Sequence, residues 1–167
     1  DKCKKCSQFG NEANNQCNEC IDGYKFITDS LAIEKNCYQV CNYYYYFNGN
    51  NQYECTASNK CPSSYNKLIS DKNKCIDDCK NDNEYIYEYN NKCYRDCPEG
   101  RKKYEKLCLD ECNDELFEYN NICYDDCPSN TYRIYTTRKI CSDTKPENYY
   151  LDTNDNIYKK CYDKCKK

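Results

Sequence analysis

Cysteine is the residue type in this chain that could do chemistry, and it supplies 19 of the 167 residues. Paired cysteines can bind zinc, act as redox-active thiols or close disulfides. From Cys37 onward most of them fall in a Cys-x-x-x-Cys motif, which recurs as CYQVC, CIDDC, CYRDC, CLDEC, CYDDC and CYDKC. A spacing repeated along the whole chain favours a disulfide framework.

Zinc is the competing interpretation at the N-terminus. Two Cys-x-x-Cys pairs, Cys3 with Cys6 and Cys17 with Cys20, have the spacing of a four-cysteine site. The other cysteines would then have no comparable role, and the chain contains no histidine. No βαβ pattern surrounds either pair, which disfavours a redox motif. We therefore expect no metal and no cofactor.

Catalytic motifs are missing from the sequence. There is no histidine to act as a base, and neither a Gly-x-Ser-x-Gly motif nor a phosphate-binding loop occurs. The paired carboxylates Asp77-Asp78 and Asp125-Asp126 lie in the tight links between cysteines. We expect a protein that is not an enzyme.

The composition requires crosslinks. Leu, Ile, Val and Phe total 21 residues, a content typical of disordered chains. Burial of so little apolar surface cannot offset the conformational entropy lost on folding. Disulfides must replace the core, which predicts an extracellular or cell-surface location.

The charge pattern disfavours nucleic acid as a partner, and the hydropathy pattern disfavours a membrane span. The net charge is −3, from 25 basic and 28 acidic residues, and no basic block occurs. We therefore expect no nucleic acid partner. No apolar run approaches the roughly 18 residues of a membrane-spanning helix, so no membrane span is expected in this chain.

The segments between motifs share one design. Each opens with Pro or polar residues, continues with an aromatic stretch such as Tyr85-Ile86-Tyr87, and turns back through polar residues to a Cys. Alternating Tyr and Ile favour strands, and Asn tolerates the positive φ of tight hairpins. The predicted fold is small, disulfide-rich and mostly β or irregular: an elongated rod of tandem single-disulfide β-finger modules.

This design yields a pairing rule in which the second Cys of one motif bonds the first Cys of the next. The predicted disulfides are Cys6–Cys17, Cys20–Cys37, Cys41–Cys55, Cys61–Cys75, Cys79–Cys93, Cys97–Cys108, Cys112–Cys123 and Cys127–Cys141. Sequence alone does not fix connectivity. An interlaced alternative, first to third and second to fourth, remains open for the four N-terminal cysteines.

Three parts are expected along the chain. Residues 1–40 hold the Cys-x-x-Cys modules, 41–144 the tandem Cys-x-x-x-Cys fingers, and 145–167 a degenerate terminal repeat. Lys145 stands where that repeat needs a second Cys, so Cys161 has no regular partner. Cys3 and Cys165 are also left over. We expect these three to be unpaired or bonded to another chain.

The run CIDDCKNDNEYIYEYNNKCYRDCPEGRKKYEKLCLDEC, residues 75–112, resembles the furin-like cysteine-rich modules of growth factor receptors. So does CNECIDGYKF, residues 17–26. The resemblance covers nearly the whole chain and rests on the spacing of Cys with the positions of Pro, Tyr and Asn. It implies a rod of single-disulfide fingers with the same local pairing.

Two surface features are candidates for binding. The run Tyr43, Tyr44, Tyr45, Tyr46 and Phe47 is the candidate interface, because it exceeds what one finger needs. Asp78, Asp96, Glu111 and Asp126 each precede the second Cys of a motif. Their carboxylates could bind calcium, or could accept backbone N–H bonds at the tight turn. A glycan is a further candidate partner.

These features predict an extracellular structural protein. We expect a subunit of a surface filament, coat or matrix that assembles head-to-tail into a homopolymer or with other surface proteins. The alternative is a ligand- or partner-binding ectodomain fragment of a cysteine-rich surface receptor or antigen.

Overall fold

Short β-strands dominate the structure, a computed structural model that describes residues 2–11 and 13–161. The helical residues of the described chain lie in single 3₁₀ turns. Two compact units divide at Asn81 and Asp82. The predicted class, a small disulfide-rich protein of β and irregular structure, is confirmed. The three-part division of the sequence stays a prediction.

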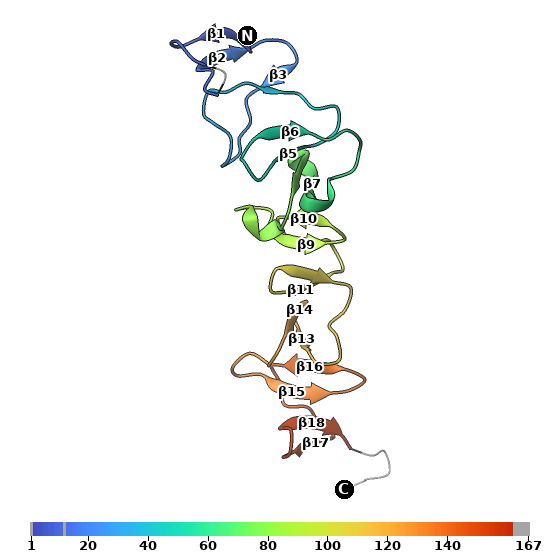
Figure 1. Ribbon diagram of the computed structural model, residues 1–167. Coiled ribbons are helices and arrows are strands. Elements are labelled where there is room, and N and C mark those ends of the chain that lie inside the picture. The colour runs from blue at the N-terminus through green and yellow to red at the C-terminus, as the bar shows by residue number, and fades with distance from the viewer. Residues whose placement is uncertain (1, 12, 162–167) are drawn as a thin grey trace. The chain divides into compact units, whose positions relative to one another are not determined.

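Unit 1 contains three sets of paired strands (Figure 1). Its elements are β1 (Cys3–Cys6), β2 (Cys17–Cys20), β3 (Tyr24–Lys25), β4 (Tyr38–Gln39), β5 (Tyr45–Phe47), β6 (Tyr53–Cys55), η1 (Ser63–Tyr65), β7 (Lys67–Ile69), η2 (Ser70–Lys72), β8 (Lys74–Ile76) and η3 (Cys79–Asn81). Strand β1 pairs with β2 and β3 with β4, and the other strands follow the order β7-β8-β5-β6.

Unit 2 is a run of hairpins. Its strands are β9 (Tyr87–Tyr89), β10 (Lys92–Tyr94), β11 (Lys102–Tyr104), β12 (Leu107–Leu109), β13 (Phe117–Tyr119), β14 (Ile122–Tyr124), β15 (Tyr132–Tyr135), β16 (Lys139–Ser142), β17 (Tyr149–Asp152) and β18 (Ile157–Lys160). Their order is β17-β18-β15-β16-β13-β14-β11-β12-β9-β10.

Successive hairpins of unit 2 join edge to edge in one manner. The first strand of each finger pairs in parallel with the second strand of the next: β9 with β12, β11 with β14, β13 with β16, and β15 with β18. In the third of these joints Glu118 is opposite Ile140. Each hairpin therefore covers the strand edge that its neighbour would otherwise expose.

Asparagine makes the tightest turns of the fingers. Asn90 and Asn91, and at the equivalent place Asn120 and Asn121, all have positive φ, between 49° and 63°. Two-residue hairpin loops need this left-handed backbone because it matches the twist of the strands. In the two-residue loop between β11 and β12, one residue has positive φ: Glu105, at 51°.

Sulfur takes the place of an aliphatic core. Of the 17 buried apolar side chains in the described chain, 8 are cysteines. In unit 2, Phe117, Cys141 and Ile157 form one buried cluster, against which Tyr119 and Cys127 pack. These side chains come from three successive fingers, so each finger completes the core of its neighbour.

A buried ion pair lies in unit 1. Lys74 Nζ of β8 is 2.7 Å from Asp29 Oδ2, and the two side chains are 6% and 2% exposed. The Tyr45 hydroxyl donates a 3.4 Å hydrogen bond to the same oxygen. The pair ties the irregular segment after β3 to the β5–β8 joint, where Tyr45 is opposite Lys74.

We predict that Lys74→Met lowers the free energy of unfolding by about 3–5 kcal/mol, because it leaves the Asp29 carboxylate buried without its partner. Urea unfolding under non-reducing conditions measures the change. The matched control is Lys4→Met, which removes the exposed 2.7 Å pair of Lys4 with Glu19 and should leave the midpoint nearly unchanged. Equal losses from both variants would contradict the role of burial.

The second prediction exchanges turn residues between two fingers. Glu105→Asn should raise the free energy of unfolding by about 1 kcal/mol, because Asn accepts the left-handed backbone with less strain than Glu. Asn120→Glu should lower it by a similar amount at the equivalent turn. Thermal unfolding of both variants without reductant checks the pair, and shifts of the same sign would refute the explanation.

Candidate functional site

Six disulfides of the structure agree with the pairing rule. They are Cys20–Cys37, Cys41–Cys55, Cys61–Cys75, Cys97–Cys108, Cys112–Cys123 and Cys127–Cys141. Their Cα–Cα distances lie between 5.4 and 5.7 Å, as unstrained disulfides require. Cys79 and Cys93 are also disulfide-bonded.

The predicted Cys6–Cys17 bond is wrong. Cys17 bonds Cys3 instead, with a Cα–Cα distance of 5.2 Å, so Cys3 is not left over as expected. Cys17 is buried, Cys3 is half-buried and Cys6 is exposed. Register shifts on both sides of Lys5 interrupt the alternation of side chains along β1, so Cys3 can bond the buried Cys17 although Cys6 lies opposite it in the strand pairing. The interlaced alternative gives the observed Cys3–Cys17 bond. Its second bond, Cys6–Cys20, is wrong because Cys20 bonds Cys37.

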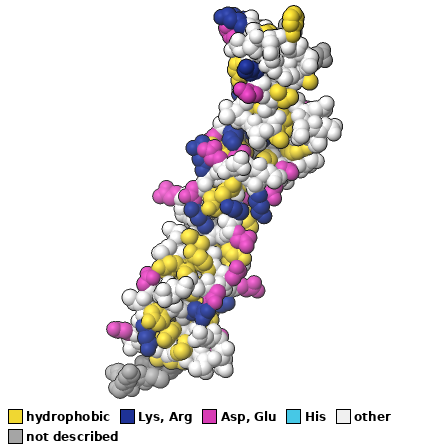
Figure 2. Space-filling view, turned by 90° about the vertical axis from the view of Figure 1, so that its left-hand side faces the viewer, with side chains coloured by type: hydrophobic (Ala, Val, Ile, Leu, Met, Phe, Trp, Pro, Cys, Tyr) yellow, Lys and Arg dark blue, Asp and Glu magenta, His cyan; other side chains and the backbone are white. Residues whose placement is uncertain are grey.

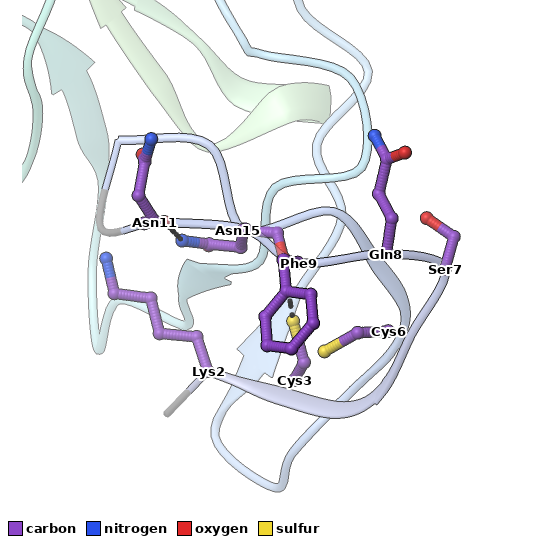
Figure 3. A pocket seen from close by; sticks show the side chains of 9 residues that line it. Lys2, Cys3, Cys6, Ser7, Gln8, Phe9, Asn11 and Asn15 are labelled. Atoms are coloured by element: carbon purple, nitrogen blue, oxygen red, sulfur yellow. Dashed lines mark hydrogen bonds between the residues drawn. The ribbon is translucent and has the colours of Figure 1, made fainter.

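The free thiol of Cys6 lies at the end of β1, next to the loop of the N-terminal hairpin. Figure 3 shows its sulfur directed toward that of Cys3, among side chains that include Lys2 and Phe9. The Phe9 ring is fully exposed. Among the described residues of unit 1, Cys6 is the one free cysteine, and its side chain is exposed.

Cys161 is the second free cysteine of the described residues and is half-buried after β18. Its lack of a partner follows from Lys145, as predicted. The Lys145 ammonium lies 5.9 Å from the centre of the Tyr158 ring. A cation–π contact thus stands where the repeat has a disulfide. Cys165 lies outside the described residues.

The proposed interface at residues 43–47 is wrong for two of its members. Tyr45 and Phe47 are each 5% exposed, whereas Tyr43 is 46% exposed. Alternate residues of β5 point to opposite faces, so this strand places Tyr45 and Phe47 inward. Their rings pack with those of Tyr38 and Tyr53. Tyr44 and Tyr46 are half-buried, and the Tyr46 hydroxyl donates to Glu54.

The acidic links are occupied by local partners. Asp96 accepts a 2.6 Å bond from the backbone N–H of Cys97 and pairs with Lys103. Asp126 repeats this arrangement with the N–H of Cys127 and the guanidinium of Arg133. The basic partners hold the pKa of both carboxyl groups below the ordinary value. Figure 2 shows basic and acidic side chains intermixed on the face in view.

A tyrosine–aspartate bond recurs between neighbouring fingers, and sequence reasoning missed it. The Tyr that ends the first strand donates its hydroxyl to the Asp two residues after the next finger's closing Cys: Tyr89 to Asp110 at 2.8 Å, Tyr104 to Asp125 at 3.0 Å, and Tyr119 to Asp143 at 2.7 Å. The signal was present as a Tyr and an Asp 21 to 24 residues apart. These bonds raise the pKa of Tyr104 and Tyr119.

Within residues 2–11 and 13–161, no cluster of three or more Cys, Asp or Glu side chains has the geometry to hold a metal ion. Three of the four cysteines of the zinc alternative are disulfide-bonded. No helix of the described chain is long and apolar enough to cross a membrane.

No protein-family model matches the chain, and searches of curated proteins and of solved structures find no match.

We predict an alkaline loss of stability that depends on Tyr53. Burial, with a smaller effect of Tyr38, raises the pKa of Tyr53 to about 12, and its hydroxyl donates a 2.7 Å bond to the Gln39 carbonyl. A raised pKa stabilises the fold fully below the ordinary tyrosine value, and this contribution disappears as pH rises toward 12. Ultraviolet difference spectroscopy of phenolate should show a late step that Tyr53→Phe removes. If Tyr53→Phe instead removed phenolate absorbance only at lower pH, the assignment of the late step to Tyr53 would be contradicted.

Proposed function

We propose that this chain is a non-catalytic subunit of an extracellular filament, coat or matrix, and that copies join head to tail. The observation that carries the proposal is the repeated joint between fingers in unit 2. Each joint uses a parallel strand pairing, and three carry the tyrosine–aspartate bond. A chain whose contacts run from neighbour to neighbour is typical of repeat scaffolds.

The polar surface also supports a structural role. Glu118 lies 2.6 Å from Lys102 of the preceding finger and 3.2 Å from Arg138 of the next. Asp96 and Asp126 pair with Lys103 and Arg133, which lie in the fingers that follow these two links. Ion pairs between neighbouring fingers restrict how one finger can move against the next, which suits a rigid structural protein.

Cys3 does not supply the bond between copies in this proposal, because it is bonded to Cys17. The free thiols of the described residues, Cys6 and Cys161, take its place in the proposal. A small-molecule disulfide can oxidise the two thiols to one bond, accepting two electrons and two protons. Bonding Cys161 of one copy to Cys6 of another is a heterologous contact, which produces open chains when rotation does not close a ring.

A second candidate function is the binding ectodomain of a surface receptor or antigen. The observation that favours it lies in unit 1, where five apolar side chains within 18 residues are exposed. They are Phe26, Leu31, Ile33, Val40 and Tyr43. Gathered apolar exposure is typical of surfaces that bind other proteins.

The test uses the full chain with Lys145→Cys, which restores the missing motif cysteine. The new thiol should capture Cys161 in an intramolecular disulfide, and closing a loop of this length stabilises by about 3 kcal/mol. We expect the parent to form covalent multimers on non-reducing gels and fibres in negative stain, and this variant to remain monomeric. Lys145→Met is the matched control, because it removes the cation and leaves Cys161 free.

Cys6→Ser should abolish covalent multimers as well. Isolated particles from the parent, together with a single monomer band, would refute the filament and favour the binding function.

A further inference from the structure

The N-terminal hairpin has four cysteines, of which Cys20 is bonded outside the hairpin to Cys37. The other three are Cys3, Cys6 and Cys17, one more than a disulfide needs. In the β1–β2 pairing Cys6 lies directly opposite Cys17, and Cys3 lies opposite Cys20. The disulfide nevertheless joins Cys17 to Cys3. Cys17 therefore has two cysteines within reach, one bonded and one free.

The distance suits a bond between Cys6 and Cys17. Directly opposite residues of an antiparallel pair have Cα atoms about 4.5 or 5.5 Å apart, both within the range that disulfides span. The Cys6 thiol is exposed and free, and Figure 3 shows it directed toward the sulfur of Cys3. A nucleophilic thiol beside a disulfide is the arrangement that exchange requires.

We propose that Cys3, Cys6 and Cys17 form an internal thiol–disulfide exchange site with Cys6 as the nucleophile. The Cys6 thiol gives its proton to water, and the thiolate attacks Cys17 Sγ. The S–S bond to Cys3 breaks, Cys3 leaves as a thiolate, and it then takes up a proton. One disulfide is made and one is broken, so the step needs no oxidant or reductant.

The strand geometry selects which sulfur is attacked. Attack on the Cys3 sulfur would produce a Cys3–Cys6 bond. Residues three apart in an extended strand are separated by about 10 Å, beyond the reach of a disulfide. Attack on Cys17 keeps the strand pairing, because Cys6 is already opposite Cys17.

The hairpin has the slack that the exchange needs. Register shifts lie on both sides of Lys5, between Cys3 and Lys5 and between Lys5 and Cys6. Such irregularities let a strand bend and re-aim its side chains. Exchange would move the free thiol from Cys6 to Cys3 while the Cys20–Cys37 bond stays in place. It occurs within one chain, so it does not depend on the proposed assembly.

Peptide mapping of the monomer tests the proposal. The parent protein is held at neutral to mildly alkaline pH, its free thiols are blocked with N-ethylmaleimide, and trypsin digests it without reduction. In the starting form, Cys3-Lys4 is disulfide-linked to the peptide of residues 6–25, and Cys6 carries the label. After exchange, Cys3-Lys4 carries the label and Cys6–Cys17 closes within that peptide.

We expect both forms, in a ratio independent of protein concentration. The approach to this ratio should accelerate as pH rises, because the thiolate is the attacking species. Recovery of the Cys3–Cys17 form alone after prolonged incubation would overturn the proposal.

Two variants fix the end states. Cys6→Ser should hold the Cys3–Cys17 bond without exchange. Cys3→Ser, folded with a small-molecule disulfide that accepts two electrons and two protons, should form Cys6–Cys17 and carry no label in residues 6–25. A Cys3→Ser protein that keeps Cys6 and Cys17 as labelled thiols would also overturn the proposal. Covalent multimers on gels report the filament separately, so either hypothesis can fail alone.

Discussion

The local closure of the hairpins by disulfides, in every finger before β17–β18, is the constraint on which the rest of the structure depends. The bonds link cysteines 11 to 17 residues apart, and each removes conformational freedom from the unfolded chain worth about 3 kcal/mol. Closure also places sulfur inside the finger, where Cys123 and Cys141 are buried. Phe117 and Ile157 then need only a neighbouring disulfide to pack on, which explains how so few aliphatic residues suffice.

Polar contacts between neighbouring fingers add to the stabilisation that the disulfides provide. A hairpin has two exposed edges and too little apolar area to fold alone. Parallel pairing satisfies the backbone at an edge, and the tyrosine–aspartate bond adds a side-chain link whose ring covers apolar surface while its hydroxyl reaches the next finger. Because each joint involves neighbours only, stability accumulates one joint at a time.

The order of cysteines along the sequence predicted most of the disulfides, because each bond closes a local loop between successive motifs. Order along the chain was insufficient where the direction of a side chain decides: Cys3 rather than Cys6 bonds Cys17, and β5 turns Tyr45 inward from the run predicted to form an interface. The Asp29–Lys74 pair was beyond prediction, since the two residues are 45 positions apart and no periodic pattern marks either. The tyrosine–aspartate bond did have a periodic signal.

Both free thiols of the described chain arise where the repeat departs from its own rule. A ladder with a Cys-x-x-x-Cys link at every step consumes all its cysteines. The shorter Cys-x-x-Cys spacing at the start turns one cysteine of β1 away from the core, and Lys145 removes a partner near the other terminus. Local departures from an otherwise consistent pattern are expected at functional sites, because there selection has kept something that stability alone would remove. The proposed exchange and the proposed joint between copies both use the free thiols at these two irregular steps.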